Sequence, residues 1–398
     1  MIHKFKLGGF NALLDVNSGG VHIIDDLTYD LLDNVEPPFE EKCPEDVVRK
    51  LSKMYDSKDI EDCYEEIVSL YNDKILFSED DYEKYALSAV ASPIKAMCLH
   101  IAHDCNLRCK YCFASTGDFG QGRMLMDYET GKRAIDFLIE RSGDRKFLEV
   151  DFFGGEPSLN FGTVEKLVEY ARSQEEPHNK KFRFTVTTNG VHLTDEMIDF
   201  INKEMYNVVL SIDGRKEVHD HMRPFRKGAG SYDLIVPKFQ KLAESRNQEK
   251  YYIRGTFTRN NLDFSNDILH FADLGFKQMS IEPVVGDESD PYAIREEDIP
   301  QIKEEYDKLA KIMIEREKEG KGFNFFHFMI DLEGGPCVMK RMSGCGSGTE
   351  YLSVTPWGDL YPCHQFVGQD EFLMGNVDEG ITKPEIADEF RSCSVYSK

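Results

Sequence analysis

Three cysteines near residue 110 have the type and spacing of a metal centre. They form the run Cys105-Asn-Leu-Arg-Cys109-Lys-Tyr-Cys112, with Phe113 directly after it. Three thiolates close together can bind three irons of a [4Fe–4S] cube and leave the fourth iron without a protein ligand. Such an open iron can bind and activate a small molecule. A structural zinc site is the alternative, but it needs a fourth Cys or His nearby, and we expect His103 to point away from the run.

The elements that must position these thiols alternate between strand and helix patterns. The predicted strands are Met97–His103, Phe147–Phe153, Phe182–Thr188, Val208–Ile212, Tyr252–Thr258 and Met279–Val285. The amphipathic stretches are Tyr128–Arg141, Thr163–Arg172, Glu196–Asn202, Leu234–Ser245, Ser265–Leu274 and Ile302–Glu317. This alternation predicts an α/β fold with a parallel sheet. Periodicity does not distinguish a doubly wound sheet from an open barrel, but either places functional loops at the carboxyl ends of the strands.

The first 80 residues predict a smaller, separate module. A hairpin is expected from Phe10–Val16 and Val21–Ile24, followed by helices near Leu27–Leu32, Pro44–Tyr55 and Ile60–Tyr71 and a short strand at Lys74–Phe77. This set suggests a winged-helix-like unit. Its role is either a stabilising cap, which the pattern alone favours, or a docking module whose sheet edge adds an extended peptide. The charged stretch 78–94 then predicts a domain boundary.

Composition narrows the class of protein. The 398 residues are 41% hydrophobic and carry a net charge of −24, which opposes binding to nucleic acid. The N-terminus has no uninterrupted apolar export signal, and no stretch approaches the 18 apolar residues of a membrane span. We therefore expect a cytoplasmic protein without membrane contact. Its ten cysteines are then metal ligands, nucleophiles or buried thiols rather than a disulfide framework.

The cysteine run after the first strand, with Gly154-Gly155-Glu156-Pro157 after the second, resembles the radical S-adenosylmethionine (SAM) superfamily. The resemblance implies a partial (β/α)6 TIM-like barrel over residues 95–320. It also implies that an open iron of a [4Fe–4S] cluster on Cys105, Cys109 and Cys112 chelates SAM. One electron then cleaves SAM, and the resulting 5′-deoxyadenosyl radical abstracts a substrate hydrogen. The residues matching the family's SAM-binding segments are Phe113, Gly154, Gly155, Glu156, Asn189, Ser211, Arg223 and Arg254.

Several of these residues have ordinary structural alternatives. Asn189 precedes a glycine and suits a turn, Ser211 can cap local backbone, and Arg254 can pair with a carboxylate. Arg223 lies in His219-Asp-His-Met-Arg-Pro224, which is either a SAM-carboxylate contact, as in peptide-modifying members of the family, or a solvated charge cluster. No catalytic side chain is assigned, because hydrogen abstraction needs no general base.

Four further cysteines lie beyond the last predicted helix. Cys345-x12-Gly358-x4-Cys363 spans a predicted hairpin and resembles the start of a SPASM domain, which carries auxiliary [4Fe–4S] clusters. The later C-x2-C-x5-C-x3-C run of that domain is absent before Lys398, so we expect residues 321–398 to be a truncated SPASM domain with incomplete auxiliary loading. Cys345 and Cys363 match ligand positions, whereas Cys337 and Cys393 are either ligands or ordinary thiols.

The whole pattern resembles maturases of ribosomally made peptides. Ile2-His-Lys-Phe5, Leu14–Gly19 and Tyr361–Phe366 with Met374–Val377 are similar to maturases of SCIFF (six-cysteines-in-forty-five-residues) peptides, which are sactionine-type thioether synthases. This resemblance implies that the enzyme joins a cysteine sulfur to an α-carbon of a cysteine-rich precursor peptide, and that residues 1–80 bind the leader. It also implies an electron donor such as flavodoxin or ferredoxin.

Two other functions compete with this interpretation. An anaerobic sulfatase maturase would share the barrel and the C-terminal motif, although the leader-binding module argues against it. An iron–sulfur electron carrier would not need an open iron beside a Gly-Gly-Glu-Pro loop, because carriers usually fill all four ligand positions.

Overall fold

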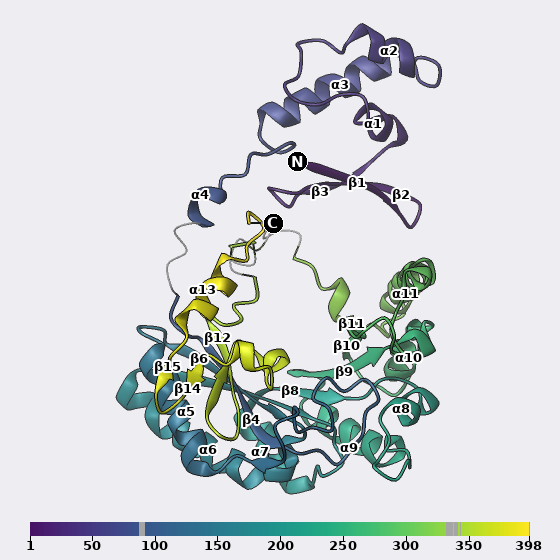
Figure 1. The fold of residues 1–398 in the computed structure, drawn as a ribbon. Coiled ribbons are helices and arrows are strands. Elements are labelled where there is room, and N and C mark those ends of the chain that lie inside the picture. The colour runs from purple at the N-terminus through teal and green to yellow at the C-terminus, as the bar shows by residue number, and fades with distance from the viewer. Residues whose placement is uncertain (87–91, 332–336, 338–340, 343, 398) are drawn as a thin grey trace. The chain divides into compact units, whose positions relative to one another are not determined.

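The computed structural model describes residues 1–86, 92–331, 337, 341–342 and 344–397, drawn as a ribbon in Figure 1. The chain divides into two compact units. The smaller unit is Met1–Ala89 with Ile330–Met342, and the larger unit is Val90–Met329 with Ser343–Lys398.

The smaller unit joins a three-stranded antiparallel sheet to helices. Its elements are β1 (Ile2–Leu7), β2 (Phe10–Asp15), β3 (Val21–Ile24), α1 (Asp26–Leu31), α2 (Glu45–Leu51), α3 (Ser57–Asn72) and the short α4 (Glu83–Ala86). The predicted hairpin and three helices are confirmed. Strand β1, which the sequence pattern did not predict, pairs with β2, and both β1 and β3 lie at edges of this sheet.

The predicted strand at Lys74–Phe77 is wrong. Lys74 and Phe77 have φ angles of 60° and 54°, so the backbone turns back instead of extending. The amides of Ile75 and Leu76 both donate to the carbonyl of Leu70, near the end of α3. Leu76 is thereby buried in the core of the smaller unit. The apolar pattern came from packing against a helix rather than from a strand.

The larger unit is built on a parallel sheet. Its central strands are β4 (Ala96–His103), β6 (Phe147–Gly154), β7 (Lys181–Thr188), β8 (Met205–Ser211), β9 (Tyr251–Phe257) and β10 (Gln278–Pro283), which pair as parallel neighbours in sequence order. All six lie where the sequence predicts strands, so the α/β class with a parallel sheet is confirmed. Because the strand order never reverses, right-handed crossovers place the connecting helices on one face, as in an open barrel and unlike a doubly wound sheet.

Short strands extend both edges of this sheet. They are β11 (Asn324–Phe325) beside β10, then β12 (Tyr351–Val354), β13 (Asp359–Tyr361), β14 (Gly375–Asn376) and β15 (Gly380–Ile381) beyond β4, with β5 (Met124–Leu125) pairing β4. β12 runs parallel to β4 and forms an antiparallel hairpin with β13, as the turn at 355–359 predicts. The C-terminal segment 344–397 therefore continues the sheet that carries the cysteine run.

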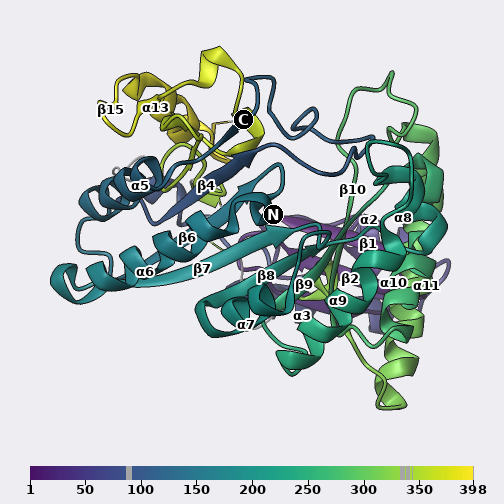
Figure 2. The same ribbon diagram turned by 90° about the horizontal axis from the view of Figure 1, so that it is seen from below.

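Helices cover the outer face of the curved sheet (Figures 1 and 2). They are α5 (Tyr128–Arg141), α6 (Phe161–His178), α7 (Asp195–Glu204), α8 (Lys216–Met222), α9 (Tyr232–Ser245), α10 (Phe264–Asp273) and α11 (Ile299–Lys318), with α13 (Pro384–Ser392) near the C-terminus. The six predicted amphipathic stretches all lie on helices, whereas α8 and α13 were not predicted. None of the described helices is long and apolar enough to span a membrane.

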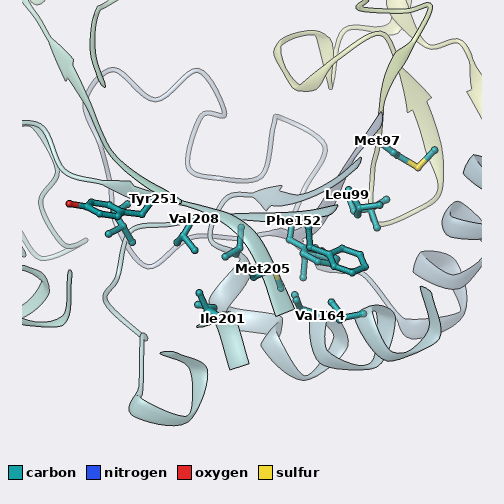
Figure 3. Close-up of a cluster of buried hydrophobic side chains, with 14 of the residues drawn as sticks. Met97, Leu99, Phe152, Val164, Ile201, Met205, Val208 and Tyr251 are labelled. Carbon is teal, nitrogen blue, oxygen red and sulfur yellow. The ribbon is translucent and has the colours of Figure 1, made fainter. Parts of the chain in front are cut away.

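Strand alternation separates an apolar face from a polar one. Along β6, the side chains of Leu148, Val150 and Phe152 are fully buried and belong to the main hydrophobic core, with Val164 of α6 (Figure 3). Successive strand residues point to opposite faces of a sheet. The intervening residues, such as Asp151, therefore face the concave side, which is left for polar groups and a cavity.

Candidate active site

The cysteine run forms a loop directly after β4, at the carboxyl end of the sheet. Cys105, Cys109 and Cys112 are free thiols, and all three line one cavity of about 520 Å³. The loop is held in place by backbone hydrogen bonds from Arg108 to Pro224 and from Lys110 to Met222, at 2.8 and 2.9 Å.

The cavity gathers the other residues predicted to contact SAM. Its wall includes Phe113, Gly154, Gly155, Glu156, Asn189, Ser211, Arg223 and Arg254. These residues come from the cysteine loop, from the ends of β6, β7 and β8, from β9, and from the segment after α8. Cys345 and Cys363 do not line this cavity.

The Gly154–Glu156 loop is packed tightly against the chain that leads into the cysteine run. The amides of Gly155 and Glu156 donate to the carbonyls of Ala102 and Asp104 at 2.7 and 2.9 Å. A Cβ atom at Gly155 would lie 2.2 Å from the Asp104 oxygen, and one at Gly154 would lie 2.3 Å from the Ala102 oxygen. Glycine at both positions is what allows this close approach.

Glu156 is 1% exposed and acts as an internal clamp between two strand ends. One carboxylate oxygen accepts from the Ser158 amide and the Thr188 hydroxyl at 3.0 and 2.8 Å, and the other accepts from the Asn189 amide at 2.7 Å. These donors already occupy both oxygens. Glu156 therefore positions the loops after β6 and β7 relative to each other.

Asn189 connects this clamp to the cysteine loop. Its side-chain amide donates to the Asn106 side-chain oxygen at 2.8 Å and lies 3.6 Å from the sulfur of Cys105. The amide of Leu107 lies 3.4 Å from the same sulfur. N–H groups directed at a cysteine sulfur stabilise a thiolate and tune an iron–sulfur centre.

A buried polar group joins Tyr111 of the cysteine run to Asp213 and Arg223, and of these three residues the sequence predicted only Arg223. The Tyr111 hydroxyl is 2.7 Å from both carboxylate oxygens of Asp213, and Arg223 donates to the Tyr111 oxygen at 2.8 Å. Arg223 and Asp213 are also paired at 3.5 Å. Tyr111 could have been suspected from its place inside the cysteine run, but no sequence pattern links it to Asp213.

The cavity wall carries a second polar group. Arg254 pairs with Glu282 at 2.8 Å, and His327 contacts the other oxygen of Glu282 at 2.8 Å. His364 lines the cavity and contacts Phe153 in a tilted arrangement, with 4.9 Å between ring centroids. Burial lowers the pKa of His364 to about 4, and the Arg254 charge acts in the same direction, so the imidazole is neutral at pH 7. Glu282, His327 and His364 were not predicted.

The thiols are protonated at neutral pH until a metal binds. Burial raises the pKa of Cys105 to about 12, with Glu156 adding to it. Burial also raises the pKa of Cys109 to about 11, although the charge of Arg223 opposes the shift. The pKa of Cys112 is raised by burial as well. A metal that bound these thiols would therefore have to displace their protons.

The donor set fits a polynuclear cluster. No three His, Cys, Asp or Glu side chains among the described residues converge closely enough to hold a single metal ion. A four-iron cube attaches each thiolate to a different iron, so its ligands need not converge on one point. Within the described ranges, no fourth cysteine lines the cavity, which suits a cube with one open iron.

The remaining cysteines lie elsewhere. Cys337, Cys345 and Cys393 are exposed, and Cys363 is half-buried just after β13. Cys98 is buried within β4, and Cys43 and Cys63 pack against the core of the smaller unit.

Comparison with known proteins identifies the class. Residues 99–253 match the model of the radical SAM superfamily, so the chain contains a radical SAM domain, which implies a [4Fe–4S] cluster and SAM. The chain is 25% identical to the antilisterial bacteriocin subtilosin biosynthesis protein AlbA of Bacillus subtilis, over 94% of this chain and 80% of AlbA. It is also 25% identical to the cysteine-type anaerobic sulfatase-maturating enzyme of Clostridium novyi, over 69% of this chain and 74% of that enzyme.

A solved structure resembles nearly the whole fold. The structure of Streptococcus suis SuiB bound to precursor peptide SuiA aligns with a TM-score of 0.55 and 16% identity, covering 99% of this chain and 88% of SuiB. This likeness extends through both compact units. It supports the same fold but not, at this identity, the same reaction.

Proposed function

We propose that this protein is a radical SAM maturase that forms thioether cross-links in a cysteine-rich SCIFF-type precursor peptide. The observation that carries the proposal is the single cavity lined by three free thiols and by every residue predicted to contact SAM. Cys105, Cys109 and Cys112 would hold the [4Fe–4S] cluster, which would supply the chemistry of reductive SAM cleavage and hydrogen abstraction from the peptide.

The chain's own residues hold and shield these reactants. Cys105, Cys109 and Cys112 ligate the cluster, while Asn189 and the Gly154–Glu156 loop form the wall beside it. The cavity sits at the carboxyl end of the sheet, and His364 and Gln365 are part of its wall. A site enclosed by side chains would limit water around a reactive radical.

A peptide substrate is supported by the smaller unit. Strand β3 lies at an edge of its sheet, and its Val21 and Ile23 side chains are 41% and 67% exposed. An exposed edge with alternating apolar side chains suits the addition of an extended peptide strand. We propose that residues 1–80 bind the leader of the precursor in this way, and that residues 321–398 carry the start of a SPASM domain.

The coverage of the relatives favours this function over sulfatase maturation. The match to AlbA extends over 94% of the chain, whereas the match to the sulfatase-maturating enzyme extends over 69%. In the proposed reaction, the α-hydrogen leaves as an atom and the thiol hydrogen leaves as a proton plus one electron. An oxidised flavodoxin or ferredoxin, or an auxiliary cluster held by Cys345 and Cys363, would accept that electron.

The test uses anaerobically reconstituted protein, SAM, dithionite and a synthetic precursor with six cysteines in forty-five residues. Mass spectrometry should find peptide lighter by two hydrogens per cross-link, with sulfur attached to an α-carbon. Cys345→Ala or Cys363→Ala should spare SAM cleavage, because both residues lie outside the cavity. Either change should prevent cross-linking, because both are proposed ligands of the auxiliary cluster. Unmodified peptide alongside rapid SAM cleavage would contradict the assigned substrate class.

A further inference from the structure

Arg223 is held at the cavity wall by hydrogen bonds of both its backbone and its side chain. Its amide donates to the His219 carbonyl at 2.7 Å, and its carbonyl accepts from the Ser231 hydroxyl at 2.9 Å. Its guanidinium donates to the Tyr111 oxygen at 2.8 Å and pairs with Asp213 at 3.5 Å. Both the backbone and the side chain of Arg223 are therefore fixed.

The tyrosine depends on an anchored carboxylate. Asp213 is fully buried, and one of its oxygens accepts from the Thr256 amide at 3.2 Å, while its own amide lies 3.4 Å from the ring of His219. The Tyr111 hydroxyl donates to the Asp213 carboxylate, both oxygens of which lie 2.7 Å away. The lone pairs of the hydroxyl oxygen face Arg223. The Tyr111 hydroxyl thus lies between the Asp213 carboxylate and the Arg223 guanidinium and fixes their separation.

The Nε donor of Arg223 has no acceptor in the part of the chain that the structure describes. This Nε atom is buried, although the side chain lines the cavity. Buried donors are rarely left unpaired, so the position calls for an acceptor from a ligand. The planar fork of an arginine matches the two oxygens of a carboxylate.

We propose that Tyr111 is a positioning residue that orients Arg223, through Asp213, to receive the carboxylate of the methionine half of SAM. This inference rests on the proposed function, because it takes the cavity to be a SAM site. Tyr111 acts through Arg223 and does not contact the reacting atoms. Its position between Cys109 and Cys112 ties the carboxylate contact to the loop that holds the cluster.

The test compares Tyr111→Phe with wild type after anaerobic reconstitution. Calorimetric titration measures binding of SAM, of L-methionine and of 5′-deoxyadenosine, which has no carboxylate. We expect Tyr111→Phe to weaken the binding of SAM and of L-methionine about tenfold, because a charge-assisted hydrogen-bond arrangement is lost. The affinity for 5′-deoxyadenosine should stay unchanged. The matched control is Tyr55→Phe, which removes a Tyr–Asp hydrogen bond of 2.7 Å in the smaller unit and should change none of the three.

The outcomes separate this inference from the proposed function. Unchanged SAM affinity at full iron content would overturn the role of Tyr111. An equal loss of affinity for 5′-deoxyadenosine would also overturn it, because that result would indicate general damage to the cavity. If Tyr111→Phe binds less iron, Asp213→Asn takes its place, since Asp213 lies outside the cysteine run, and it must show the same selective loss. Wild-type protein with a full cluster that binds no SAM would refute the proposed function itself.

Discussion

Gly155 offers a direct test of how the Gly154–Glu156 loop packs against the cysteine loop. A methyl group at this position would lie 2.2 Å from the Asp104 oxygen and 2.7 Å from the Gly117 oxygen, and both are backbone atoms that cannot rotate away. Gly155→Ala should therefore push the Gly154–Glu156 loop off the cysteine loop. Two backbone hydrogen bonds, at 2.7 and 2.9 Å, would be lost or stretched.

The expected cost follows from these contacts. Two hydrogen bonds contribute about 1 kcal/mol each, and overpacking adds about 1–3 kcal/mol, so Gly155→Ala should lower the free energy of unfolding by about 3–5 kcal/mol. For a domain of this size the melting temperature should fall by roughly 6 °C or more. Iron content after reconstitution should fall as well, because Asp104 precedes the first cysteine ligand.

Gly162→Ala is the matched control for this experiment. Gly162 lies in α6 with open space around the added methyl group, so alanine should leave stability unchanged or raise it by up to about 1 kcal/mol. Thermal unfolding followed by circular dichroism compares the two variants. A Gly155→Ala protein that melts with wild type and binds the same iron would refute the close packing of the two loops.

Three further changes test individual side chains. Burial raises the pKa of Asp15, but hydrogen bonds led by Ser78 outweigh it and hold that pKa below its ordinary value. The stability that Asp15 contributes is therefore present above about pH 4 and lost in more acidic solution. In Asp15→Asn the melting temperature should depend less on pH in that window. Glu156→Gln should cost about 2 kcal/mol or more in urea unfolding, because an amide NH2 group would face a buried donor; wild-type stability would contradict the clamp. Asp127 caps α5 by accepting from the Thr130 amide at 2.7 Å, so Asp127→Ala should cost about 1 kcal/mol, and equal loss in Asp127→Asn would argue against capping.

Sequence alone predicts the parts of the site that are continuous in the chain. The cysteine run is one such stretch, and Gly154–Glu156 is another. Strand-and-helix periodicity predicts the parallel sheet, and the sheet then brings Asn189 and Ser211 to the same cavity. Their precise contacts depend on side-chain directions, which periodicity does not predict. Glu156 matched a SAM-binding segment, yet its carboxylate accepts hydrogen bonds from donors within the protein.

The rest of the site depends on contacts between distant segments. Tyr111 and Asp213 are 102 residues apart, and Glu282 and His327 are 45 apart, so only the curvature of the sheet brings each pair together. His364 reaches the cavity from beyond β13, after the last predicted barrel helix. In the smaller unit, the strand predicted at Lys74–Phe77 failed because left-handed backbone is not visible in an apolar pattern.

Cys105, Cys109 and Cys112 are the proposed ligands of a cluster that cleaves SAM. The most direct measurement is 5′-deoxyadenosine formed by anaerobically reconstituted protein with SAM and dithionite, quantified by mass spectrometry beside Cys109→Ala and the core variant Cys63→Ala. We expect steady formation by wild type and Cys63→Ala, and none by Cys109→Ala. Equal formation by Cys109→Ala, or none by wild type with a full cluster, would contradict the assignment.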